Sequence, residues 1–142
     1  MKRGYKIGLW IVGAVWVIAM IALLPRFISL HEETRSAKRV FNEYRAALVR
    51  QDLDGAYQLC GTDFQKAMPH DEFVELQQNL QNQYGKLKSV SQKAFEVRGS
   101  GDPMYWRAVV DGDFVYERKT LRFEFVLHKE GERWVVFGAE QL

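Results

Sequence analysis

The first pattern along the chain is an apolar run near its N-terminus. Residues 7–24, "IGLWIVGAVWVIAMIALL", carry no charged side chain. At a rise of 1.5 Å per residue, a helix of this length reaches roughly 27 Å, close to the thickness of the hydrocarbon core of a bilayer. The run therefore predicts a transmembrane helix, with a leader before it (residues 1–6) and a juxtamembrane linker after it (residues 25–33).

Two later segments show the spacing of amphipathic helices. Within residues 34–50 the apolar positions fall on one stripe: Ala37, Val40, Phe41, Tyr44, Ala47 and Leu48. After Pro69 a second stripe holds Phe73, Leu76, Gln77, Leu80 and Tyr84. Asp71 and Glu72 suit the first turn of this second helix, and Gly85 suits its end.

Residues 86–142 show the alternation that is typical of strands. In residues 120–128, Leu121, Phe123, Phe125 and Leu127 share one face, and Arg122, Glu124 and His128 share the other. The residues "KEGE" predict a turn before a last strand at 133–140, while residues 87–98 and 104–110 predict two earlier strands. Helices followed by about four strands predict an α+β fold, with the helices packed on one face of a curved antiparallel sheet.

The segment "DGDFVYE" allows two interpretations. Asp111-Gly112 is a strong hairpin signal, but Gly112 also suits a bulge that lets one long strand bend. We favour the bent strand, because Phe114 and Tyr116 continue the alternation after the glycine.

The start of the chain predicts an anchor and its orientation. Signal peptides have a shorter apolar region, about 7–15 residues, that ends at a small-x-small site. The best such triplet, Val17 to Ala19, lies inside the run, so we favour a permanent anchor over a cleaved signal. The basic leader then predicts a cytoplasmic N-terminus and an exported remainder. Trp16 falls in mid-membrane, where it faces lipid or packs against another membrane subunit.

Charge argues against a nucleic-acid partner. Residues 1–31 hold four basic side chains and no acid, whereas residues 32–142 hold 16 basic and 18 acidic ones. Binding a nucleic-acid backbone requires a concentrated basic patch, and a body at −2 is poorly suited to it. The composition, 47% apolar and 27% charged, is that of one globular domain plus a membrane segment.

No side chain is assigned to catalysis, to a cofactor or to a metal. Cys60 is the single cysteine and is interpreted as a small buried hydrophobe. The histidines, His31, His70 and His128, are not spaced as metal ligands. Three tyrosines that might supply a phenol are interpreted as core aromatics: Tyr57, Tyr84 and Tyr105. Asp111 and Asp113, which flank Gly112, are interpreted as a solvated strand bend.

Residues 34–142 resemble the nuclear-transport-factor-2-like (ketosteroid-isomerase-like) cone-fold superfamily. The resemblance rests on "FNEYRAALVRQDLDGAYQLCGTDFQKAM", "EFVELQQNLQNQYGKLKSV" and the closing "LHKEGERWVV". The most similar members are small bacterial proteins that sit outside the cytoplasm behind a signal or an anchor. One membrane helix joined to an exported cone domain also resembles a subunit type of type IV secretion systems, whose domains are longer.

The resemblance implies a role for "RQDLDGAYQLC". In such folds a long first helix ends at a short acidic turn, which makes Asp54 the N-cap of a second helix and Gly55 a first-turn residue. The competing interpretation is a calcium loop. Counted from Asp52, such a loop needs an oxygen ligand fifth, Gly sixth and Glu twelfth, where this chain has Ala56, Tyr57 and Asp63. We therefore expect no metal there.

Two functions remain in view. The first is a non-catalytic, single-pass protein of the bacterial inner membrane, whose periplasmic or otherwise extracytoplasmic domain is an accessory, assembly or scaffold subunit of a membrane complex. The alternative is a membrane-tethered binder of a small apolar ligand, in a cone pocket lined by side chains such as Phe95, Trp106 and Phe123. Large residues at nearly every inward strand position favour a filled cone, and hence the first function.

Overall fold

The computed structural model describes the backbone of residues 4–142 and the side chains from residue 15 onward. Residues 1–3 of the predicted leader lie outside the described residues, as do the side chains of the first half of the apolar run. The chain divides into two compact units, Met1–Glu32 and Glu33–Leu142.

Helix α1 spans Gly4–Val49 and includes Pro25. Residues 25–33, predicted as a linker, are therefore helical, and Ser29 Oγ donates to the Pro25 carbonyl at 2.8 Å. From Val15 to Leu30 the large apolar side chains are exposed, Trp16 by 70%. Among the described residues, α1 is the one helix that is long and apolar enough to cross a membrane.

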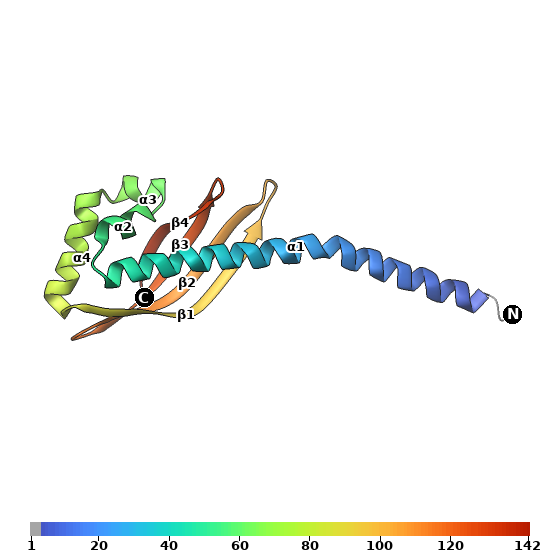
Figure 1. Cartoon of the computed structure of the whole chain (residues 1–142), viewed down its shortest axis with the longest axis horizontal. Helices are drawn as coiled ribbons and strands as arrows, with labels where there is room; N and C mark the ends of the chain where they lie inside the picture. Colours follow the sequence, from blue (N-terminus) through green and yellow to red (C-terminus); the bar gives the residue numbers. More distant parts are fainter. Residues whose placement is uncertain (1–3) are drawn as a thin grey trace. The chain divides into compact units, whose positions relative to one another are not determined.

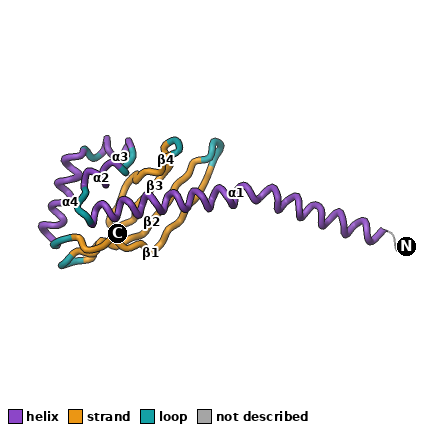
Figure 2. The backbone as a smooth tube through the Cα atoms, viewed as in Figure 1, coloured by secondary structure: helices purple, strands orange, loops and turns teal. Residues whose placement is uncertain are grey.

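The second unit has the predicted α+β architecture. After α1 come α2 (Leu53–Gln58), α3 (Thr62–Ala67) and α4 (His70–Tyr84), then β1 (Leu87–Ser100), β2 (Tyr105–Tyr116), β3 (Thr120–Glu130) and β4 (Arg133–Gln141). The strands form one antiparallel sheet in the order β1-β2-β3-β4, and the helices cover one of its faces (Figures 1 and 2). We call this the inner face.

The core lies between the amphipathic part of α1 and the inner face. The predicted stripe is buried at Ala37, Phe41, Tyr44, Ala47 and Leu48. The Phe41 ring lies 5.3 Å from the Phe125 ring of β3, centroid to centroid. Burial of apolar surface stabilises the fold by about 25 cal/mol for each Å² removed from water. Burial of this stripe therefore holds the helix on the sheet.

The strand through Gly112 is continuous, as predicted, but the irregularity lies in its neighbour. Gln92 pairs with Gly112 and Ala94 with Asp111, which leaves Lys93 as the extra residue in β1. A Cβ on Gly112 would lie 2.6 Å from the Ser91 carbonyl oxygen. Glycine is therefore needed here for close backbone approach, and the predicted bulge at Gly112 is wrong.

The turn after α1 corrects a second prediction. Asp52, and not Asp54, is the N-cap of α2, because its side chain accepts a hydrogen bond from Gly55 N at 3.0 Å. Asp54 lies in the first turn, where it faces the His70 ring at the start of α4. Gly55 is a first-turn residue, as expected. The short helix α3 was not predicted, since six residues are too few to show helical periodicity.

Candidate functional site

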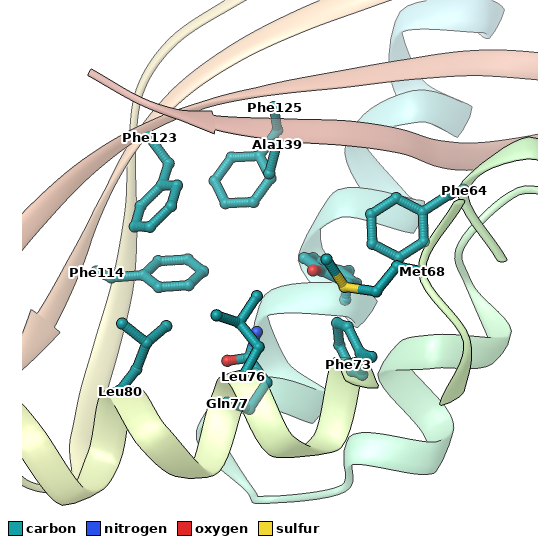
Figure 3. Close-up of a pocket in the computed structure, with 11 residues that line it drawn as sticks. Phe64, Met68, Phe73, Leu76, Gln77, Leu80, Phe114, Phe123, Phe125 and Ala139 are labelled. Carbon is teal, nitrogen blue, oxygen red and sulfur yellow. The ribbon is translucent and has the colours of Figure 1, made fainter. Parts of the chain in front are cut away.

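The second unit contains an apolar cavity between the helices and the sheet (Figure 3). Its volume is about 90 Å³. The lining comes from α1, α3, α4 and the last three strands: Tyr44, Phe64, Met68, Phe73, Leu76, Gln77, Leu80, Phe114, Phe123, Phe125 and Ala139. The predicted stripe of α4 supplies four of these side chains, because its apolar face turns toward the sheet.

Two lining side chains carry polar groups, Tyr44 and Gln77. Both residues are buried, and within the described residues neither the Tyr44 hydroxyl nor the Gln77 amide has a side-chain hydrogen bond. Burial, with smaller contributions from Cys60 and Tyr116, raises the pKa of Tyr44 far above its ordinary value, so the phenol stays neutral. The cavity can therefore accept an apolar group and offer it one phenol and one amide, but no charge.

The cavity opens beside the last strand. Leu76 of α4 is 42% exposed although it lines the cavity, and Ala139 of β4 is also exposed. In Figure 3 Leu76 and Gln77 project from α4 toward the sheet, where Phe123, Phe125 and Ala139 lie. Leu76 and Ala139 therefore leave apolar surface accessible at the mouth of the cavity.

Only part of the predicted pocket lining is correct. Phe123 lines the cavity, but Phe95 and Trp106 do not. Phe95 instead stacks edge-on against Phe41 with 6.5 Å between ring centroids. The register shift at Lys93 separates the two halves of β1, and Phe95 of the second half packs on Phe41 in the C-terminal part of α1. The sequence signal for the actual site was the predicted stripe of α4, which includes Leu76 and Leu80.

The histidines lie outside the cavity and make separate contacts. His70 Nε2 lies 2.5 Å from Asp54 Oδ1. The hydrogen bond with Asp54 raises the pKa of His70, burial opposes the shift, and a hydrogen bond with Asp71 supports it. His31 lies in the first unit.

His128 lies on the same side of its strand as Arg122 and Glu124, as the alternation predicts, but it is not exposed there. It is on the outer face of the sheet, yet it is buried there between the Tyr105 hydroxyl, 3.0 Å from Nδ1, and the Phe137 ring. Glu130 Oε1 lies 3.4 Å from its Nε2. Tyr105 itself is exposed, so the prediction of a core aromatic is wrong for this residue.

The remaining candidates are held in structural roles. Cys60 is buried as predicted, and burial raises its pKa to about 12, which keeps the thiol protonated. Asp113 is not fully solvated, because it pairs with Lys93 at 2.7 Å. Tyr57 donates to the Met68 carbonyl at 2.9 Å. Within the described residues, no three His, Cys, Asp or Glu side chains are grouped so that they could hold a metal ion.

The cavity holds no acid or base, and the one histidine network of the sheet lies on the opposite, outer face. Comparison with known proteins adds no family: no protein-family profile matches the chain, and no curated protein matches it.

Proposed function

We propose that this chain is a single-pass membrane protein that works by contact and not by turnover. In this proposal residues 7–24 anchor it in the bacterial inner membrane with the N-terminus in the cytoplasm. Residues 34–142 form an extracytoplasmic domain of the cone-fold superfamily that serves as an accessory, assembly or scaffold subunit of a membrane complex. The chain would use neither cofactor nor metal.

The observation that carries this proposal is the exposed apolar stretch of α1. Exposed apolar side chains follow one another from Val15 to Leu24 without a charge between them, and such a patch marks a surface that contacts a membrane or another protein. Insertion into a bilayer removes that surface from water. An anchor also raises the effective concentration of the domain toward other membrane proteins without any additional contact.

The cavity supports the alternative, binding of a small apolar ligand. Its volume of about 90 Å³ is smaller than the engineered cavities of about 150 Å³ that enclose benzene. The space fits one side chain better than an independent ligand, so we rank contact first. The two functions differ in whether the domain must stay at the membrane.

The test is complementation of a deletion strain with three forms of the protein. These are the full chain, the domain released behind a cleavable signal, and the domain on an unrelated membrane helix. We expect full rescue by the first, weak rescue by the second and partial rescue by the third if Trp16 packs on a partner. Full rescue by the released domain contradicts the contact function and supports a diffusible-ligand binder.

A further inference from the structure

The two edges of the sheet differ in how their backbone groups are protected. On β1, Arg45 Nη1 donates to the Val90 carbonyl at 3.2 Å, and Lys88 and the irregular Lys93 interrupt the edge. On β4, residues 59–61 pair with Val136: Gly61 N donates to Val136 O at 2.8 Å, and Val136 N donates to Leu59 O at 2.9 Å. Beyond Phe137 this cover ends, and lysine and proline, which natural proteins use to blunt edges, are absent from residues 138–142.

The direction of the uncovered groups follows from the strand register. Leu142 N donates to the Arg122 carbonyl at 2.9 Å and so points toward β3. In antiparallel strands successive residues point their backbone groups to opposite sides. Ala139 and Gln141 therefore point their N–H and C=O groups away from the sheet, and within the described residues no partner satisfies them.

The same residue that presents free backbone groups also lines the cavity. Ala139 pairs with Phe125 on the inner face, and it lines the cavity across from Leu76 and Met68 (Figure 3). A strand added to β4 would place every second side chain on this face. The side chain opposite Ala139 would enter the apolar cavity, near the unpaired Gln77 amide.

The outer face of the same edge carries a row of acidic side chains, with Arg122 two residues from Glu124 on the same face. Asp111, Glu124 and Glu140 are paired across β2, β3 and β4 and form one row that ends at the free edge. Within the described residues none of the three has an ion-pair partner. Like charges directly opposite one another destabilise a sheet, and a basic side chain on a neighbouring strand reduces this repulsion.

We propose that residues 138–142 of β4 bind an extended segment of another protein in which a large apolar residue alternates with lysine or arginine. The apolar side chain fills the cavity, the basic side chain lies beside Glu140, and the guest backbone bonds to Ala139 and Gln141. The guest continues the edge pairing that residues 59–61 begin. Affinity comes from the backbone bonds and specificity from the alternating side chains. The inference rests on the proposed contact function and names the surface that makes the contact.

The test uses the full chain in nanodiscs of zwitterionic lipid and a short capped peptide of alternating lysine and leucine. We expect the peptide to slow hydrogen exchange of the Ala139 and Gln141 amides, measured by NMR. Empty nanodiscs give the background of peptide binding to the lipid. Peptides with glutamate in place of lysine, or alanine in place of leucine, should bind at least about tenfold more weakly. Equal binding of the glutamate peptide, or protection along β1 instead, overturns the inference.

Variants locate the contact. Ala139→Pro removes an outward donor without removing a bond to β3, and Glu140→Lys reverses the edge charge; each should weaken peptide binding by about tenfold or more. Glu132→Lys makes the same charge change in the β3–β4 turn and should leave binding unchanged. If Ala139→Pro unfolds, Leu76→Asp provides a second block at the cavity mouth. Unaltered binding by Glu140→Lys and Leu76→Asp contradicts the inference.

The outcome is separable from that of the proposed function. Loss of peptide binding together with normal rescue by the membrane-anchored chain rejects the β4 site and leaves the contact function standing. Full rescue by the released domain rejects the contact function itself, whatever the peptide does.

Discussion

The two stretches of α1, residues 15–30 and residues 34–49, are both helical, but the apolar side chains of the first are exposed and those of the second are largely buried. Between Val15 and Leu30 the large side chains are exposed, whereas Phe41, Tyr44 and Leu48 are buried. The difference lies in the pattern, because charges interrupt the second stretch and leave one apolar stripe, while residues 15–24 of the first are apolar on every side. A stripe can be buried by one sheet, but a fully apolar helix needs a surrounding apolar medium.

The largest expected effect comes from removing a ring from the buried stripe. Phe41→Ala should lower the free energy of unfolding of the domain by about 3–5 kcal/mol, because it leaves a cavity against Phe125. Denaturant unfolding of the solubilised chain, followed by tryptophan fluorescence, measures this. Phe27→Ala makes the same change in the exposed stretch and should alter stability by less than about 0.5 kcal/mol. Equal effects would break the comparison.

The next effect concerns the first stretch alone. Ile18→Arg should disfavour membrane insertion by about 2.5–3.5 kcal/mol, since a central arginine is costly in hydrocarbon. The fraction of chain that resists carbonate extraction measures insertion. Glu43→Arg, on the exposed side of the second stretch, is the matched control and should leave extraction unchanged. If the Ile18→Arg chain resists carbonate extraction as well as the unaltered chain does, residues 7–24 are not the anchor.

A third change tests the contacts that hold the start of the second stretch on the sheet. The Glu33 carboxylate accepts hydrogen bonds from Lys129 Nζ at 2.6 Å and Trp134 Nε1 at 2.7 Å. Glu33→Gln should destabilise the domain by about 1–3 kcal/mol, because the half-buried Lys129 loses its counter-charge. Glu32→Gln, one residue earlier and exposed, should have little effect in the same unfolding experiment.

A smaller effect separates the two aspartates after the second stretch. Asp52→Ala removes the N-cap of α2 and should cost about 0.5–2 kcal/mol of stability. Asp54→Ala loses only an exposed pair with His70, which typically contributes less than about 1 kcal/mol. Melting temperatures of the two variants test the assignment, which is wrong if Asp54→Ala is the more damaging.

The smallest effect is a difference in response to acid. Burial acts to raise the pKa of Glu130, but hydrogen bonds from Thr62 and His128 outweigh it and hold the pKa below its ordinary value. Its contribution to stability is therefore present above the unfolded pKa and is lost as the pH falls through the folded pKa. Glu130→Gln should flatten the fall in stability between neutral and acidic pH, and Glu132→Gln should not. Residues 15–24 hold no ionisable side chain, so membrane insertion should show no such dependence.

Periodicity predicted the parts of this fold that are long and regular. The stripe of α1, the face of α4 and the four strands were all readable because each repeats its pattern several times. The cap at Asp52 was missed because Asp54 satisfies the same residue preference, and only the backbone path distinguishes them. The cavity could not be located from the sequence either. Phe95 and Phe123 are both inward aromatic residues of the sheet, yet Phe95 packs on Phe41 and Phe123 lines the cavity, and their residue type does not distinguish them.

The contact of Glu33 with Trp134 spans 101 positions along the chain, whereas every strand pairs with its immediate neighbour in sequence. Neighbouring strands close short loops, which form rapidly, but a contact of this separation must wait for the rest of the chain. The β1–β2–β3 meander can therefore assemble before residues 133–141 are available, while the helix is secured on the sheet only when they arrive. Until then part of the apolar stripe around Phe41 stays accessible to solvent. During that interval the folding chain is most prone to aggregate through this stripe.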